Sequence, residues 1–532
     1  MRQKDGIIPA LLGIAMAAVG TAATRGQATT PETPPAGVAP TSNSIAVADF
    51  EDSIRTRQGG MFFCVGGRPG QVRDGLVRPG DPEAGAWRIE MSADAATTGA
   101  GGVVPLYDAC PAVSRGDQAK AGAAETSPAG VDVSHTPVLH LRLIGQLGQR
   151  QLRVEAIAGK PVGPETVGVT LATLPADAID ARRWRDIPIT LAESEIDLRR
   201  VTGIRLLIEG TGEAWLAVDS IGLVASTSGS RIPQPGPAKP HPLRYAMWSW
   251  RTESILRNPD QRDALMTFCR EREITDLFSQ VLYEYRDGKV TLQEVDSQRR
   301  LNALARRSGI RVHALDGHRS YALEANHPRL LELADALIRF NEEGAPETRF
   351  HGVHLDNEPY LLAEWKNEAT RPAVLQAYYE LNRRLAPRLK EAHLEFGLDI
   401  PFWWDKVDES GRAVFRVMTA DGEKPLLEAV FPLVQNVAVM SYRDRVTGCN
   451  GVVSHCRTEF GLGQRLGVDV FASIETGAGE RFEKGTTFGP YSRAYFEWQF
   501  DTLKRVLSGE PGCSGLAVHA YKYYREILEK QP

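Results

Sequence analysis

Short runs that alternate between apolar and polar residues dominate the first part of the chain. They occupy residues 45–50, 87–91, 138–144, 151–156, 167–174, 187–191, 204–208 and 215–224, with clusters of Gly, Pro, Asp and Ser between them. A period of two is typical of a strand that buries one face, and no long helical period interrupts these runs. The pattern therefore predicts an all-β sandwich over residues 45–226.

From residue 243 onward, apolar strand-like runs alternate with amphipathic segments of helical period, for example 260–271, 328–341, 371–392 and 491–507. The predicted strands are residues 245–248, 274–281, 312–316, 352–358, 396–400, 437–442, 470–474 and 515–521. Eight such pairs, with a helix at the end, are typical of a (β/α)8 TIM barrel. A doubly wound α/β sheet is the alternative, but it seldom has eight regular units, and we find no Gly-rich phosphate loop after the first strand.

Three further segments complete the predicted domain organisation. Arg2 and Lys4 precede an apolar stretch over 7–19 and small residues at 21–23, which predicts a signal peptide over residues 1–23. Residues 24–44 are rich in Pro, Thr, Ala and Gly and read as a disordered linker, and residues 227–242 form a Pro-rich linker before the barrel at 243–532. We expect a secreted or periplasmic protein without membrane contact after cleavage; a retained N-terminal anchor is the alternative.

Composition narrows the class of partner. The chain has 532 residues, which suggests two or three domains, and a formal net charge of −5. Such a charge gives no reason to expect nucleic acid or an anionic membrane as a partner.

The ends of the predicted barrel strands carry the candidate chemistry, because active sites of such barrels lie at the C-terminal ends of the strands. Acids and aromatic residues collect there, and free cationic groups are scarce. Carboxyl groups transfer protons and attack acetals, while aromatic faces stack on the C–H faces of sugar rings. A carbohydrate substrate is therefore predicted, with these candidate substrate-binding residues: Trp248, Trp250, Asp316, His318, Trp403, Trp404, Asp444, His519 and Tyr521.

The fourth predicted strand is the centre of this site. Alternation places His354, Asp356 and Glu358 on one face, directly before Pro359. Solvated acids at an exposed strand end, or a divalent metal held by the same three side chains, are the competing interpretations. No H-x-H or H-E-x-x-H motif occurs in the sequence, so we expect catalysis without a metal or another cofactor.

Asn357-Glu358-Pro359 at the end of strand four, with Glu475 ending strand seven, resembles the retaining (β/α)8 glycoside hydrolases of clan A. The resemblance implies that Glu358 is the general acid/base and Glu475 the nucleophile. Asp356 would raise the pKa of Glu358 as a neighbouring like charge, and Tyr442 would donate a hydrogen bond to Glu475. Asn357 and His354 are the other supporting residues. Strand eight lacks the Trp that many clan members have there.

A second resemblance stays open. Asp356-Asn357-Glu358 together with Met440-Ser441-Tyr442 resembles the Asp-x-Glu and Met-x-Tyr motifs of chitinase-type barrels, in which the substrate acetamide replaces the enzyme nucleophile. Asp356 would then position the acetamide. His351 and His354 stand where that family has two more acids. A non-catalytic polysaccharide-binding protein with an inactive barrel is the third interpretation.

The predicted sandwich resembles galactose-binding-like jelly rolls at both ends, in Asp49-Phe50-Glu51-Asp52 and in the run from Trp215 to Ile221. In such modules, acids of the end strands often hold a structural calcium. Glu51 and Asp219 are the candidate ligands here, because hard cations prefer oxygen donors. Two unrelated surface acids are the alternative.

Overall fold

The computed structural model describes residues 44–48, 63–65, 72–76, 86–91, 100–105, 133, 136, 138–158, 167–191, 201–224, 241–408, 411–446, 451–480, 482–483 and 485–530. The predicted signal peptide, the first linker and most of the second linker lie outside these residues and stay predictions. Within the described residues, no helix combines the length and the apolar character needed to cross a membrane.

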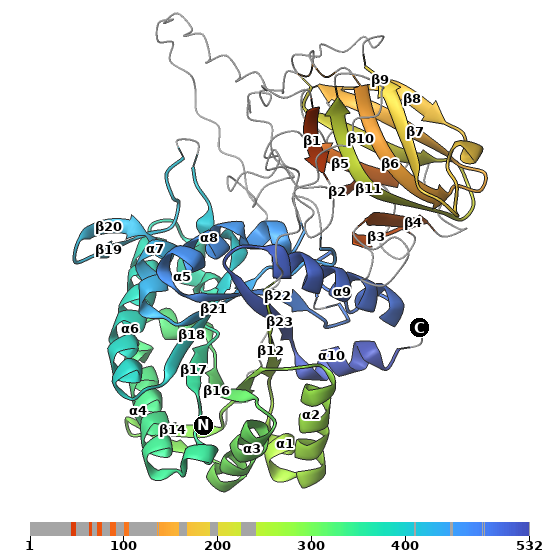
Figure 1. Cartoon of the computed structure of the whole chain (residues 1–532). Helices are drawn as coiled ribbons and strands as arrows, with labels where there is room; N and C mark the ends of the chain where they lie inside the picture. The colour runs from red at the N-terminus through yellow and green to blue at the C-terminus, as the bar shows by residue number, and fades with distance from the viewer. Residues whose placement is uncertain are drawn as a thin grey trace, which may run out of the picture.

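The N-terminal region forms two antiparallel sheets, drawn from red to yellow-green in Figure 1. One has the order β3-β4-β11-β6-β9, with β1 also paired to β11, and the other has the order β2-β5-β10-β7-β8. Along β4, Trp87, Ile89 and Met91 are buried while the residues between them are partly exposed, as the alternation predicts. The antiparallel sheets are confirmed, and the jelly-roll arrangement stays a prediction. The strands are β1 (Ser44–Ala48), β2 (Phe63–Val65), β3 (Val72–Leu76), β4 (Trp87–Met91), β5 (Ala100–Pro105), β6 (Val138–Gln146), β7 (Gln151–Ala158), β8 (Val167–Leu174), β9 (Arg185–Thr190), β10 (Gly203–Glu209) and β11 (Ala214–Val224).

The C-terminal region is a closed barrel of eight parallel strands, as predicted. These strands are nearly all apolar because both of their faces are buried, one by the barrel interior and one by the helices. They are β12 (Arg244–Ser249), β13 (Asp276–Gln280), β16 (Arg311–Asp316), β17 (Gly352–Leu355), β18 (Glu395–Pro401), β21 (Asn436–Met440), β22 (Asp469–Glu475) and β23 (Cys513–His519).

Helices surround the barrel (Figure 1). The longer ones are α2 (Pro259–Glu271), α3 (Val295–Arg307), α4 (His327–Glu343), α6 (Arg371–Glu391), α8 (Arg457–Leu466), α9 (Arg493–Gly509) and α10 (Tyr521–Leu528). Shorter helices are α1 (Glu253–Arg257), α5 (Ala363–Lys366) and α7 (Leu426–Val430), and two small hairpins are β14–β15 (Tyr283–Arg286, Lys289–Leu292) and β19–β20 (Arg416–Thr419, Gly422–Pro425). Each long helix buries one apolar stripe, for example Leu330, Leu333, Ala334 and Leu337 of α4.

Two imidazoles fill the barrel interior, and glycine on the next strand makes room for one of them. His313 and His354 are fully buried. Gly397 of β18 lies beside His354, and a Cβ there would come within 2.4 Å of its Nδ1 and 2.1 Å of Asn436 Oδ1. The barrel therefore keeps a polar layer between its ends.

An ion network closes the N-terminal end of the barrel. Asp276, at the start of β13, lies within 2.6 Å of Arg244, 2.8 Å of Arg311 and 3.1 Å of His313, and Thr275 Oγ1 donates to it over 2.7 Å. Burial alone would raise the pKa of Asp276, but His313 and Arg244 outweigh it and hold that pKa below its ordinary value. Active sites of such barrels lie at the opposite, C-terminal end, so this network contributes to stability rather than to chemistry.

Three strands end at least two residues earlier than predicted. β17 ends at Leu355, three residues before Glu358, and β21 ends at Met440, two residues before Tyr442. β23 ends at His519, so that Tyr521 begins α10. Pro359 has no N–H for a ladder, which excludes pairing beyond Glu358, and the pairing of β17 already stops after Leu355. Asp356, Asn357 and Glu358 therefore lie on an irregular segment above the strand.

Candidate active site

Glu358 lies at the C-terminal end of β17, immediately before the one-turn helix Pro359–Leu361. Tyr360 donates a hydrogen bond from its hydroxyl to Glu358 Oε2. Burial raises the pKa of Glu358 to about 7, with a further rise from Asp399, against the opposing effects of Tyr360 and His519. A carboxyl group with such a pKa exchanges its proton near neutral pH, as a general acid requires.

Asp356 is the second acid of this segment. Burial raises its pKa well above the ordinary value, and the charges of Glu358, Asp399 and Asp316 raise it further. Gly317 on the neighbouring strand end leaves room for it, because a Cβ there would lie 2.8 Å from Asp356 Cβ. Among the described residues, no group hydrogen-bonds to the buried Asp356 Oδ1. The surroundings of Asp356 therefore favour its protonated form, and its Oδ1 is an acceptor without a partner among the described residues.

Glu475 ends β22 in a different environment. Its Oε1 accepts hydrogen bonds from the backbone N–H groups of Thr476 (2.8 Å) and Gly477 (2.7 Å), and its Oε2 lies 2.7 Å from His519 Nδ1. The residue is 4 % exposed. N–H donors stabilise the ionised form of a carboxyl group. Glu475 is thus oriented by contacts at both of its carboxyl oxygens.

His519 joins Glu475 to the first strand of the barrel. Trp250 Nε1 donates to His519 Nε2 over 3.0 Å. Burial acts to lower the pKa of His519, but Glu475, with smaller effects of Asp399 and Glu358, raises it overall. One imidazole therefore feels the charge of both predicted catalytic residues.

Below this layer, Asp399 accepts hydrogen bonds from two rings. Trp248 Nε1 donates to its Oδ2 over 3.0 Å, and His354 Nε2 lies 2.7 Å from its Oδ1. Phe278 stacks on His354 with ring centroids 3.8 Å apart. His354 thus lies beneath the acids and contacts Asp399, and its supporting role stays a prediction. Trp248 contributes its indole N–H to the floor rather than an open ring face.

Tyr442 follows β21 and lies among the acids. Burial raises its pKa well above the ordinary value, and the charges of Glu475, Asp399, Asp356 and Glu358 add to the rise. The charges of four carboxyl groups therefore act on the single hydroxyl of Tyr442. Among the described residues, the hydrogen bonds to the Glu475 carboxyl group come from Thr476, Gly477 and His519, so the predicted bond from Tyr442 is absent.

Asp316, at the end of β16, belongs to a neighbouring cluster. Its Oδ2 accepts hydrogen bonds from Tyr283 (2.8 Å) and Tyr321 (2.7 Å), and Arg329 donates to the Tyr283 hydroxyl over 2.9 Å. Burial raises the pKa of Asp316 despite these donors. The cluster adds a polar wall next to Asp356, whose pKa it also influences.

Three of the predicted substrate-binding residues have contacts with residues outside the group of acids formed by Asp356, Glu358, Asp399 and Glu475. Trp404 is buried and packs edge-on against Tyr378 of α6, and Tyr521 packs against Phe268 of α2. Asp444 accepts a hydrogen bond from Tyr491 over 2.5 Å. These three side chains are engaged in packing or in holding a loop.

His318 and Trp403 lie nearer the rim of the barrel. His318 is exposed and caps the short helix Arg319–Ala322 through Ser320. Trp403 is half-buried and packs edge-on against Tyr360, with centroids 5.3 Å apart. Trp403 thus supports the tyrosine that hydrogen-bonds Glu358.

Asn357 is 2 % exposed, and among the described residues its side-chain oxygen and nitrogen have no hydrogen-bond partner. A buried amide in that state has a high desolvation cost, and a substrate hydroxyl would satisfy it. No role was predicted from the sequence for Asp399 or Tyr360, and Tyr283, Tyr321 and Arg329 were not predicted as site residues. Only the loop length after β13, which holds the β14–β15 hairpin, hints at Tyr283.

Within the described residues, no group of three or more His, Cys, Asp or Glu side chains is arranged to hold a metal ion. Glu51 lies outside the described residues. Asp219 Oδ2 is 3.4 Å from Arg142 Nε, and Ser220 donates to it over 3.1 Å. Arg142 supplies a cation that competes with calcium for this carboxylate, so the described surroundings of Asp219 do not favour the predicted calcium site.

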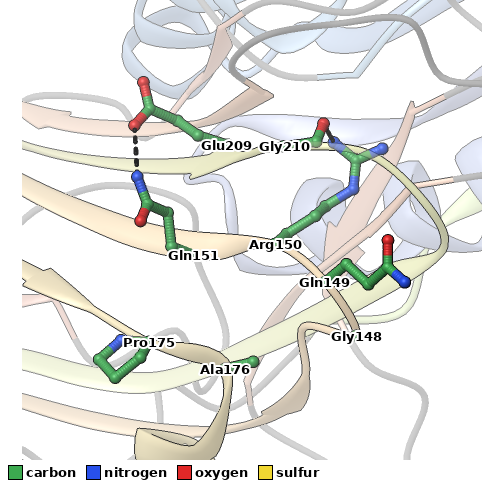
Figure 2. A pocket seen from close by; sticks show the side chains of 8 residues that line it. All are labelled: Gly148, Gln149, Arg150, Gln151, Pro175, Ala176, Glu209 and Gly210. Carbon is green, nitrogen blue, oxygen red and sulfur yellow. Dashed lines mark hydrogen bonds between the residues drawn. The ribbon is translucent and has the colours of Figure 1, made fainter.

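A separate hollow lies at one edge of the N-terminal sheets (Figure 2). Arg150 donates to the carbonyls of Gly210 (2.6 Å) and Gly212 (2.7 Å), which fixes the turn between β10 and β11. Gln151 Nε2 reaches Glu209 Oε2 over 3.5 Å at the same edge. The eight lining residues include no aromatic ring, so the hollow lacks the platform expected of a sugar-stacking site.

Comparisons with known proteins give structural neighbours only. No protein-family model matches the sequence, and a search of curated proteins gives no significant match. A Clostridium thermocellum endo-1,4-β-D-xylanase, solved with its carbohydrate-binding module and xylohexaose, covers 90% of this chain and 90% of its own at 9% identity, with a TM-score of 0.33.

Two further neighbours each cover about half of this chain. A chitinase from Chromobacterium violaceum covers 54% of this chain and 96% of its own at 13% identity, with a TM-score of 0.33. An exo-β-1,4-mannosidase from an Opitutaceae bacterium covers 54% of this chain and 55% of its own at 13% identity, with a TM-score of 0.36. All three neighbours are glycoside hydrolases. Because the identities and TM-scores are low, we base the functional proposal on the residues of the site.

Proposed function

We propose that this protein is a glycoside hydrolase that cleaves O-glycosidic bonds of a poly- or oligosaccharide with retention of configuration. One observation carries the proposal: two carboxyl groups at the mouth of one barrel have opposite environments. Burial gives Glu358 a pKa of about 7, while three N–H donors hold Glu475 as a carboxylate. Acid and nucleophile of a retaining glycosidase need these two states at the same pH.

In the proposed reaction, protonated Glu358 donates its proton to the glycosidic oxygen as the bond to the anomeric carbon breaks. Glu475 attacks that carbon and forms a covalent glycosyl–enzyme ester. Glu358, now ionised, removes a proton from a water molecule that attacks the same carbon and releases Glu475. Both carboxyl groups then regain their starting states, so no cofactor is required.

A second candidate is substrate-assisted hydrolysis of an N-acetylated sugar. The buried Oδ1 of Asp356, which has no partner among the described residues, favours it because this atom could accept the acetamide N–H. The absence of a Tyr442 hydrogen bond to Glu475 is consistent with this candidate too. In this mechanism the acetamide oxygen attacks the anomeric carbon, and Glu475 is not required for the chemical step.

The proposal includes a carbohydrate substrate and export through the predicted signal peptide. Export is supported by the positively charged Arg2 and Lys4, which precede the apolar stretch over residues 7–19.

Glu358→Gln and Glu475→Gln test the function on a panel of aryl glycosides, with and without a 2-acetamido group. We expect kcat of each variant to fall by at least about 1,000-fold. Glu364→Gln on α5, an exposed glutamate, is the matched control and should keep full activity. Azide added to Glu475→Gly should restore turnover and give a glycosyl azide with inverted configuration, because azide then replaces the nucleophile.

The outcomes separate the candidates. If Glu475→Gln keeps full activity on 2-acetamido substrates while Asp356→Asn and Glu358→Gln lose it, the substrate-assisted mechanism is correct. Full activity of Glu358→Gln on every substrate would refute both mechanisms. A wild-type protein that binds polysaccharides but hydrolyses none would identify the barrel as a binding module.

A further inference from the structure

We propose that His519 is a positioning residue that selects Glu475 Oε2 as the attacking atom, acting as a neutral imidazole whose tautomer is fixed by Trp250. The inference rests on the proposed function of Glu475 and adds the arrangement that orients it. It assigns His519 and Trp250 a role other than direct substrate binding.

Strand pairing brings the two residues of this contact together. Glu475 and His519 are register partners on the parallel neighbours β22 and β23, and each is the last residue of its strand. Trp250 follows β12, which pairs with the other edge of β23. Three adjacent strand ends thus supply an indole, an imidazole and a carboxyl group in series.

The hydrogen bonds fix the tautomer of His519. An indole N–H can only donate, so the 3.0 Å contact from Trp250 Nε1 requires a lone pair on His519 Nε2. The proton of the neutral ring is then on Nδ1, where it donates to Glu475 Oε2 over 2.7 Å. The assignment follows from the network, since hydrogen positions are set by their partners.

The two oxygens of Glu475 are not equivalent. Oε1 accepts two backbone N–H groups, at 2.8 Å and 2.7 Å, which occupy both of its lone pairs. Oε2 accepts one hydrogen bond among the described residues, that of His519, and keeps one lone pair. Oε2 therefore has the electron pair that can form a bond to an anomeric carbon, and His519 sets the direction of that pair.

The groups that face His519 determine its response to acid. The charged groups are Glu475, Asp399 and Glu358, and the neighbouring rings are Trp248, at 5.7 Å between centroids, and Tyr442, at 6.0 Å. The negative charges of the three acids favour a second proton on the imidazole. That proton would have to bind Nε2, the atom that accepts the hydrogen bond from Trp250 Nε1. The acids therefore favour protonation of Nε2, while the indole N–H disfavours it.

This competition has a consequence for rate. An imidazolium beside Glu475 would hold the electron pairs of the carboxylate more tightly and weaken it as a nucleophile. Because its N–H occupies Nε2, Trp250 lowers the pH at which the imidazolium of His519 forms. The active range of the enzyme is thus extended on its acidic side by an indole N–H that does not touch Glu475.

Three variants test the inference. His519→Phe removes the donor and should lower kcat by about 100-fold with KM changed less than about threefold, because orientation of a reacting group is worth that much. His519→Asn offers an amide N–H close to the position of Nδ1–H and should recover most of the loss. Trp250→Phe keeps a ring but loses the N–H, and it should move the acidic limb of the kcat–pH profile to higher pH.

A spectroscopic readout keeps the inference separate from the proposed function. Histidine nitrogen NMR of the intact protein should show His519 protonated on Nδ1 alone at neutral pH, and Trp250→Phe should change its titration. A proton on Nε2 alone, or a wild-type kcat and pH profile in His519→Phe, would overturn the inference. If the tautomer is found but no glycoside is hydrolysed, the proposed function fails while the role of His519 as the orienting donor stands. Thermal unfolding of His519→Phe and His519→Asn should give similar midpoints, which excludes misfolding as the cause of the lower kcat in His519→Phe.

Discussion

Both ends of the barrel bury carboxyl groups, but they treat the charge in opposite ways. At the N-terminal end, Asp276 is fully buried, yet Arg244, Arg311 and His313 surround it and its pKa lies below the ordinary value. At the mouth, Asp356 has other acids as neighbours and its pKa is raised well above the ordinary value. Burial is common to both, so the neighbouring charges decide which acid stays ionised.

The comparison separates stability from chemistry. At the N-terminal end of the barrel, Asp276 is paired with positively charged groups, which stabilise its ionised form and leave it no proton to transfer. At the mouth, the acids repel one another when ionised, which lowers the stability of the fold. The same repulsion raises their pKa values, so that they hold protons that can be transferred. Changes at the two ends should therefore have different effects on activity and on stability.

Asp276→Asn is the largest expected perturbation of stability. It leaves Arg244 and Arg311 without their shared carboxylate and should lower the free energy of unfolding by about 3 kcal/mol, as removal of one partner of a buried pair does. kcat of the folded fraction should stay at the wild-type value. Chemical denaturation and steady-state kinetics measure the two quantities. Asp469→Asn, at the half-exposed partner of Arg244, is the control and should cost less than about 1 kcal/mol. A large loss of kcat in Asp276→Asn would contradict the assignment of the N-terminal end of the barrel to stability and of the mouth to chemistry.

The pH dependence of stability is the next prediction. Between about 4.5 and about 7, folded Glu358 binds a proton that the unfolded chain has lost, so the free energy of unfolding should fall as pH rises through this range. The contribution of Glu358 is fully present below its unfolded pKa and is lost as pH passes about 7, amounting to about 3 kcal/mol.

Urea titrations at several pH values measure that slope. Glu358→Gln should make it shallower, and Glu364→Gln should leave it as in wild type. An unchanged slope in Glu358→Gln would show that the proton uptake belongs to another group of the mouth, with Asp356 the first to test.

Tyr360→Phe should have the smallest effect. The hydroxyl of Tyr360 lowers the pKa of Glu358, so its removal should raise that pKa and move the alkaline limb of the kcat–pH profile to higher pH, by less than about one pH unit. The cost in stability should be about 1 kcal/mol, as for one hydrogen bond. A shift of the limb to lower pH would contradict the assignment of Glu358 as the acid.

The sequence was sufficient to predict the barrel, because its strands are apolar runs separated by helices of regular period. It also led to the prediction of Glu358 and Glu475 as the catalytic pair, because each stands next to a turn residue where an apolar run ends, and their roles stay a prediction. The predicted ends of β17, β21 and β23 were wrong: β17 and β21 end before the polar residues Asp356 and Ser441, and Tyr521 packs as a helix residue against Phe268.

The partners of these acids were not predictable in the same way. The contact of Trp250 with His519 joins residues that are 269 positions apart, and it depends on the closure of β12 against β23. Trp404 and Asp444 show the opposite error: residue type and position suggested a site, while packing against Tyr378 and the hydrogen bond from Tyr491 decide their surroundings.

The series Trp250–His519–Glu475 crosses the seam where the first strand of the barrel meets the last. During synthesis, Glu475 leaves the ribosome before His519 does, and it has no orienting imidazole until β23 inserts between β22 and β12. A nascent or C-terminally truncated chain therefore lacks the contact of His519 with Glu475 even when seven strands are in place. If Glu475 is the nucleophile, as proposed, hydrolytic activity should begin only after β23 has closed the barrel.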